Sequence, residues 1–201
     1  MKKLSMLMVV VPAAWLLQAC NGGSNSKVSD STASVAKDAT SVRETVKADT
    51  SKMNAVADTG DVKFAAEAAS GGMTEVALGK IAEEKGVNPR VKKFGAMMVT
   101  DHSKANDKLK ALAKSKNIAL PAAPNAGDQN TIDKLSQKSG KDFDDAYVSD
   151  MIDDHQHDIK AFEGASKTLK DPDLKAFAIK TLPVLKAHLD AINAVHDSMK
   201  K

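Results

Sequence analysis

Apolar residues recur every three or four positions along four long stretches of the chain, which is the spacing of one face of an α-helix. The stretches cover about 62–85, 89–116, 141–169 and 172 onward. Gly86 and Pro89 mark the joint between the first two stretches, and Asp171 and Pro172 mark the joint between the last two. The pattern predicts two helical hairpins, with a connector at 117–140 that holds a short helix at about 131–138.

The two predicted hairpins resemble each other in sequence at an offset of 83 residues. The matches include aromatic and proline positions: Phe64 with Tyr147, Pro89 with Pro172 and Phe94 with Phe177. Two similar hairpins joined by a long crossover connector form a ferritin-like four-helix bundle. We therefore expect an all-α fold with this bundle at 61–201.

The N-terminus has the pattern of an exported bacterial lipoprotein. Lys2 and Lys3 precede an apolar stretch at 4–17, and Leu17-Gln18-Ala19-Cys20 resembles a lipobox. We expect 1–19 to be a lipoprotein signal peptide, Cys20 to be lipidated, and 20–60 to be a flexible or partly helical tether rich in Ser, Thr, Ala, Asp and Lys. In the alternative, the protein is cleaved and soluble, and Cys20 is incidental.

These features predict a cell-envelope protein that faces the periplasm and is held by its lipid, with the outer membrane as the expected membrane. The net charge is +3, and Lys2 and Lys3 belong to the segment expected to be removed. The near-neutral remainder gives no electrostatic reason to expect nucleic acid as a partner. The membrane, contacted through Cys20, is the only partner that the sequence indicates.

Four polar residues interrupt the apolar faces of the four predicted helices: Glu75, His102, His155 and His188. Counted from the hairpin joints they lie at heights that agree within about 3–5 Å, at about 1.5 Å per residue. Buried carboxyl and imidazole groups are costly unless they are paired or bound to a metal. The pattern therefore indicates either a site for a single Zn, Cu, Fe or Mn ion or an inert, hydrogen-bonded Glu–His layer. A third alternative is that one or more of these residues turns to solvent.

Two aspartates directly precede two of these histidines. Asp101 and Asp154 could orient a neighbouring imidazole through its second nitrogen, or they could be exposed solvating charges. The Glu-x-x-His pairs of a di-iron centre are missing, because Val99 and Leu185 stand three residues before His102 and His188. No catalytic motif is present, so we do not expect an enzyme.

Several stretches between about 61 and 199 carry a resemblance to a known family: Phe64 to Val76, Asn88-Pro89 to Phe94-Gly95, Met98 to Asn106, Asp154-His155, Phe162-Glu163, and Asp171-Pro172 through Thr181-Leu182-Pro183 to His188. Through these stretches the chain resembles a bacterial family known as domain of unknown function 4142, whose members are exported, often lipid-tethered and assigned to the ferritin-like group. The resemblance implies a bundle in the envelope and no particular reaction.

We therefore expect an envelope lipoprotein whose bundle is a binding or stress-related module holding one metal ion. One alternative is a structural or interaction protein whose Glu–His layer is inert. The other is a metal-dependent redox enzyme.

The lipid anchor is tested by Cys20→Ser. We expect this variant to move from the membrane fraction to the soluble fraction on cell fractionation, because the membrane attachment depends on the acylated thiol. A variant that stays in the membrane fraction would contradict the predicted anchor.

Overall fold

The computed structural model describes residues 57–200, which form five helices. Their bounds are α1 Thr59–Lys85, α2 Pro89–Ser115, α3 Ala126–Ser136, α4 Gly140–Thr168 and α5 Pro172–Met199. The predicted signal peptide, Cys20 and nearly all of the predicted tether lie outside the described residues. Among residues 57–200, no helix combines the length and the apolar composition that crossing a membrane requires.

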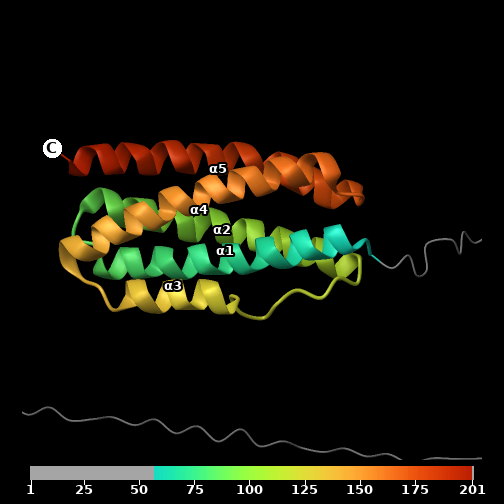
Figure 1. Ribbon diagram of the computed structural model, residues 1–201, viewed down its shortest axis with the longest axis horizontal. Coiled ribbons are helices and arrows are strands. Elements are labelled where there is room, and N and C mark those ends of the chain that lie inside the picture. Colours follow the sequence, from blue (N-terminus) through green and yellow to red (C-terminus); the bar gives the residue numbers. More distant parts are fainter. Residues whose placement is uncertain (1–56, 201) are drawn as a thin grey trace, which may run out of the picture. The chain divides into compact units, whose positions relative to one another are not determined.

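The helices form the two hairpins that the sequence predicts, α1 with α2 and α4 with α5 (Figure 1). Helices α1 and α5 run in one direction along the bundle, and α2 and α4 run in the other. Parallel α2 and α4 require the connector between them to return along the whole bundle, and it does so with α3 packed against α1. The predicted all-α bundle with a long crossover is confirmed.

Side-chain caps explain where several helices begin. Asn88 accepts a hydrogen bond from the backbone N–H of Arg90, directly before the proline that opens α2. Asn125 accepts from Gly127 and Asp128 and starts α3 at Ala126. The predicted start of this short helix at about 131 was therefore wrong, because Asn125 was not recognised as a cap.

The buried apolar side chains form two clusters, one toward each end of the bundle. One includes Phe64, Leu109, Phe162, Leu174 and Phe177. The other includes Leu78, Phe94, Met98, Tyr147, Met151 and Ile192. Each of the four long helices contributes to both clusters, and its residue of the predicted polar layer stands between its two contributions. The polar layer is therefore enclosed by apolar packing on both sides.

Two buried carboxylates join the hairpins at opposite ends. Asp61 of α1 is 3% exposed and accepts hydrogen bonds from the backbone N–H groups of Lys170 and Asp171, both at 2.9 Å. Asp144 of α4 is 2% exposed and accepts from Val87 at 3.2 Å and Asn88 at 2.7 Å.

Each hairpin thus caps the turn of the other, and the two carboxylates are themselves 83 residues apart, like the sequence repeat. We call Asp61 and Asp144 the reciprocal clamps. Since they bind opposite ends of the bundle, they fix the axial position of one hairpin against the other.

Helices α1 and α2 cross closely at two glycines near the polar layer. A Cβ atom added to Gly79 would lie 2.8 Å from the carbonyl oxygen of Gly95, and one added to Gly95 would lie 2.7 Å from that of Gly79. Any side chain at either position would force the helices apart. The crossing lies one turn from Glu75 and brings the backbones of both hairpin helices together beside the site.

The reciprocal clamps are tested by Asp144→Asn. We expect a loss of about 1–3 kcal/mol in the free energy of unfolding, because the amide NH2 would face one of the two partly buried backbone donors. Urea unfolding measures the effect. The matched control is Asp145→Asn on the exposed face, where the ion pair with Lys141 is worth at most about 1 kcal/mol. Equal losses in the two variants would contradict the assignment.

Candidate metal centre

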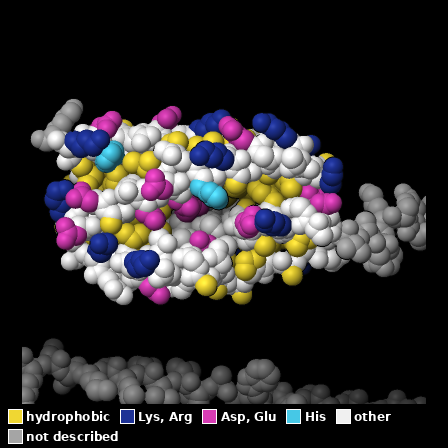
Figure 2. Space-filling view, in the orientation of Figure 1, with side chains coloured by type: hydrophobic (Ala, Val, Ile, Leu, Met, Phe, Trp, Pro, Cys, Tyr) yellow, Lys and Arg dark blue, Asp and Glu magenta, His cyan; other side chains and the backbone are white. Residues whose placement is uncertain are grey.

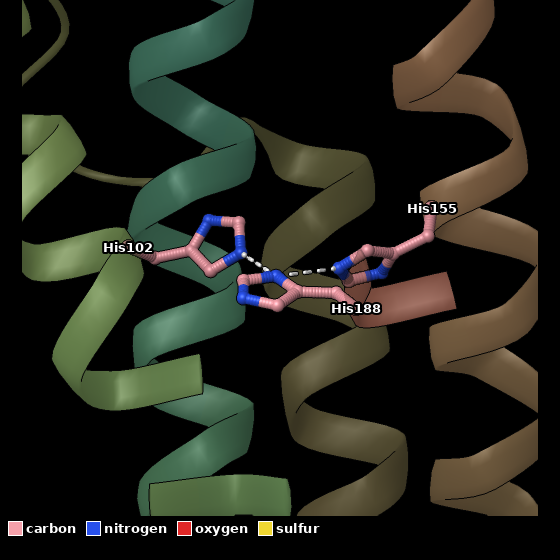
Figure 3. Close-up of side chains that lie close together, drawn as sticks. All are labelled: His102, His155 and His188. Atoms are coloured by element: carbon pink, nitrogen blue, oxygen red, sulfur yellow. Dashed lines mark hydrogen bonds between the residues drawn. The ribbon is translucent and has the colours of Figure 1, made fainter. Parts of the chain in front are cut away.

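The four predicted polar residues meet in the middle of the bundle, one from each long helix. Their exposed fractions are 1% for Glu75, 6% for His102, 0% for His155 and 2% for His188. Figure 3 shows the three imidazole rings pointing toward one another from α2, α4 and α5. None of the four turns to solvent, so that alternative is wrong.

The inner nitrogens of the three histidines lie at the spacing of metal ligands. His188 Nδ1 is 3.3 Å from His102 Nε2 and 3.4 Å from His155 Nε2. One nitrogen from each of the three rings lies within 4.8 Å of the others. Two nitrogens bound to one tetrahedral ion, at metal–nitrogen distances of about 2.0–2.1 Å, are about 3.3–3.4 Å apart. The two shortest separations therefore match the edges of such a tetrahedron.

The outer nitrogens of two of these rings face oxygen acceptors. His155 Nδ1 lies 2.9 Å from the carbonyl oxygen of Met151, which can only accept. His188 Nε2 lies 3.2 Å from Asp101 Oδ2. If each outer nitrogen donates its N–H, a neutral imidazole presents a lone pair on the inner nitrogen. Oxygen partners of this kind fix the orientation of metal-binding histidines.

The third ring, that of His102, has Glu75 as the partner of its outer nitrogen, and the protonation of Glu75 decides which nitrogen of the ring carries the proton. His102 Nδ1 lies 2.6 Å from Glu75 Oε2, and burial followed by the charge of Asp128 raises the pKa of this carboxyl well above its usual range. A protonated Glu75 donates to His102 Nδ1, and His102 then carries a proton on Nε2 and donates to His188 Nδ1. Once the Glu75 proton leaves, His102 can instead donate from Nδ1 and turn a lone pair inward, as its neighbours do.

All three imidazoles favour the neutral form that binds metals. Burial is the largest cause in each case: it lowers the pKa of His102 to about 4 and that of His155 to about 3, and it also lowers the pKa of His188. His102 and His188 also lower the pKa of His155, and His102 also lowers that of His188. The inner lone pairs of His155 and His188 are therefore free of protons at neutral pH, and that of His102 becomes free once the Glu75 proton leaves.

An acidic group lies against the same cluster. Burial first, and then the charge of Glu75, raises the pKa of Asp154 to about 9 and that of Asp158 to about 7. Burial and the charge of Asp153 raise the pKa of Asp150 to about 6. Asp154 was predicted from the sequence and Asp150 and Asp158 were not, although a spacing of four residues places all three on one face of a helix.

Glu75 is placed differently from the three histidines that were predicted with it. A ligand atom of Glu75 lies within 4.8 Å of ligand atoms of Asp154 and His155, which makes a second group beside the three-histidine group. Toward His102 it faces the outer nitrogen, not the inner one. Asp101, also named from the sequence, contacts the ring of His188 across the bundle.

The fold and this cluster define a class of helical bundles with a buried histidine layer at mid-height. The chain belongs to the family described as Domain of unknown function (DUF4142), whose family model matches residues 45–195. No curated protein sequence matches the chain.

Two solved structures share the fold at low sequence identity. One is a DUF305 fragment from Deinococcus radiodurans, with 12% identity, a TM-score of 0.61, and coverage of 69% of this chain and 96% of that chain. The other is a DUF305 protein from Streptomyces coelicolor, described as a candidate secreted protein, with 12% identity, a TM-score of 0.58, and coverage of 68% and 91%. At this identity the likeness shows the fold alone.

The raised pKa of Asp154 predicts a pH-dependent effect of Asp154→Asn in the metal-free protein. As pH rises from about 4 to about 9, the unfolded chain has released a proton that the folded chain still holds, so wild-type stability is progressively lost. Asn has no such proton. We therefore expect the stability of the variant relative to wild type to increase with pH over this range, as measured by urea unfolding in chelator.

The neighbouring exposed residue supplies the control for this experiment. Asp153→Asn changes the same charge on the solvent side of α4 and should give a nearly constant difference. A stability difference for Asp154→Asn that is flat with pH would contradict the assigned burial of a protonated carboxyl.

Proposed function

We propose that this protein is a lipid-anchored protein of the bacterial envelope whose bundle binds one metal ion at His102, His155 and His188, with Glu75 beside it. The observation that carries the proposal is the convergence of three neutral imidazoles whose inner nitrogens have the spacing of tetrahedral ligands. The anchor at Cys20 is the second part of the proposal. The candidate secreted neighbour from Streptomyces coelicolor supports export.

The donor set favours some ions over others. Three imidazole nitrogens suit Zn(II) or Cu better than Mn(II), which prefers oxygen ligands, and Fe(II) lies between them. Binding would require the proton shared by Glu75 and His102 to leave, since only then does His102 Nε2 offer a lone pair. The deprotonated Glu75 would then hold His102 in the binding tautomer and supply a negative charge next to the cation.

The proposed activity is metal binding rather than catalysis. The site is nearly closed to solvent, with the histidines 0–6% exposed, and it lies between two apolar clusters. No nucleophile–base pair is found by sequence, and the arrangement supplies ligands rather than a substrate pocket. Metal binding is the function this geometry supports best.

A structural role is the second candidate, and a specific contact pattern favours it. With Glu75 protonated, hydrogen bonds run from Glu75 through His102 and His188 to Asp101 and link three helices without a metal. The chain of bonds leaves His155 Nε2 and Glu75 Oε1 without donors, however, at 3.6 Å from each other. Buried acceptors left in this way weigh against a layer that is complete without a cation.

Metal binding is tested on the stripped protein with Zn(II). If the ion binds only the folded state, we expect a stabilisation of about 2.7 kcal/mol at a concentration of 100 times Kd, with a stoichiometry of one from calorimetry. His188→Ala should abolish both effects because it removes the nitrogen nearest to the other two rings. The control His157→Ala removes an exposed histidine from α4 and should retain them.

The structural alternative predicts a different result. If neither Zn(II) nor Cu(II) changes the melting temperature and no metal accompanies protein purified from its native envelope, the metal proposal is overturned. The double variant His102→Leu with His188→Leu should then keep or raise stability, since apolar replacement of a buried polar set is often neutral or better.

A further inference from the structure

Two potential ligand atoms beside the histidine cluster are not used by the proposed ion, a carboxylate oxygen of Glu75 and one of Asp154. Glu75 Oε1 is buried and has no hydrogen-bond partner among the described residues. It lies 3.6 Å from His155 Nε2, which also lacks a donor when His155 donates to Met151 from its other nitrogen. A carboxylate oxygen of Asp154 completes a group whose atoms lie within 4.8 Å of one another. A buried oxygen and a ring nitrogen that both need a donor or a cation point to a ligand between them.

The surroundings of this group attract cations. Asp150, Asp154 and Asp158 lie on successive turns of α4, and each is partly exposed. Every charged group that shifts the pKa of Asp154 is another carboxylate, including Asp128 on α3. Figure 2 shows acidic side chains gathered near the middle of the face on which α4 lies.

Hydrogen bonds fix the position of Asp128, the acidic residue that α3 contributes beside the carboxylates of α4. Asp128 Oδ2 accepts from Ser70 Oγ at 2.5 Å and from Asn125 Nδ2 at 2.8 Å, so the carboxylate is tied to α1 and to its own helix cap. A fixed carboxylate on this face raises the local concentration of cations and their rate of association.

The opposite side of the cluster is unfavourable for a cation. There, Asp101 contacts His188 and lies 3.7 Å from the ammonium group of Lys104. The cavity at this position, about 220 Å³ in volume, is also lined by Lys108 and Lys180. An approaching cation meets three lysines on this side and carboxylates on the other.

We propose that Glu75, Asp154 and His155 form an outer position for a divalent cation, through which the ion enters from the α4 face and passes to the three histidines. This inference rests on the proposed function and names the route to that same site. With both carboxyl protons released to solvent on binding, the outer position would offer two carboxylate oxygens and one nitrogen, a set that also accepts harder ions such as Mn(II). The inner position has nitrogens alone.

The two positions share one ligand atom. His155 Nε2 faces both His188 Nδ1 at 3.4 Å and Glu75 Oε1 at 3.6 Å, while its other nitrogen is held by Met151. A neutral imidazole nitrogen has one lone pair and binds one ion. One ion would therefore occupy one position at a time, with His155 Nε2 as the ligand common to both.

The route is tested by stopped-flow binding of Co(II) to the full chain, purified in detergent and stripped of metal. In Asp154→Asn we expect association and dissociation to slow together by about tenfold, because both directions cross the outer position. The affinity should then change by less than about threefold. The control Asp153→Asn, on the exposed side of α4, should bind at the wild-type rate.

The outcomes separate this inference from the proposed function. If wild type binds no Co(II), the proposed function fails and the route fails with it. If wild type binds and Asp154→Asn associates at the same rate, the route alone is overturned. A loss of affinity through faster dissociation would also overturn it, since Asp154 would then only support the inner position.

Occupancy of the outer position is tested with Mn(II) by electron paramagnetic resonance. Wild type should bind one Mn(II), Zn(II) should displace it through competition for His155, and Asp154→Asn should lose Mn(II) while still binding Zn(II). Simultaneous binding of Mn(II) and Zn(II), or Mn(II) binding unchanged in Asp154→Asn, would overturn the shared position.

Discussion

The structure depends on the reciprocal clamps, in which Asp61 and Asp144 each bind the turn of the other hairpin. A slip of one residue along a helix moves its side chains by about 1.5 Å. The inner nitrogens of His188 and His102 belong to different hairpins and lie 3.3 Å apart, so a slip of that size would separate them. Two buried carboxylates at the ends of the bundle therefore control the geometry of a cluster at its middle.

Burial of the central cluster between the two apolar clusters determines the protonation of its side chains. Apolar packing above and below the layer favours the neutral forms of the imidazoles and raises the pKa of Glu75, because charged forms lose their hydration there. The same burial that makes these groups costly makes them available as ligands. It leaves the partly exposed carboxylates of α4 as the neighbouring groups in contact with solvent.

The fold and the members of the cluster could be predicted because both follow from helical periodicity. The positions of Glu75 and His188 break an apolar stripe, and counting from the hairpin joints gives their height. The clamps could not be predicted in this way, since Asp61 in the first turn of a helix has the same pattern as an exposed residue that complements the helix dipole. Which nitrogen of His102 meets Glu75 depends on side-chain torsions, and the sequence does not encode these in any simple period.

The cluster takes two residues from each hairpin, Glu75 and His102 from the first and His155 and His188 from the second. Neither hairpin holds the set alone, so anything that bridges these side chains also cross-links the hairpins. A cross-link between Glu75 and His188 would close a loop of more than a hundred residues. Closing a long loop removes more entropy from the unfolded chain than closing a short one. The chain has one cysteine and cannot form an internal disulfide. A ligand or proton shared by these side chains at the centre of the bundle would instead cross-link the two hairpins.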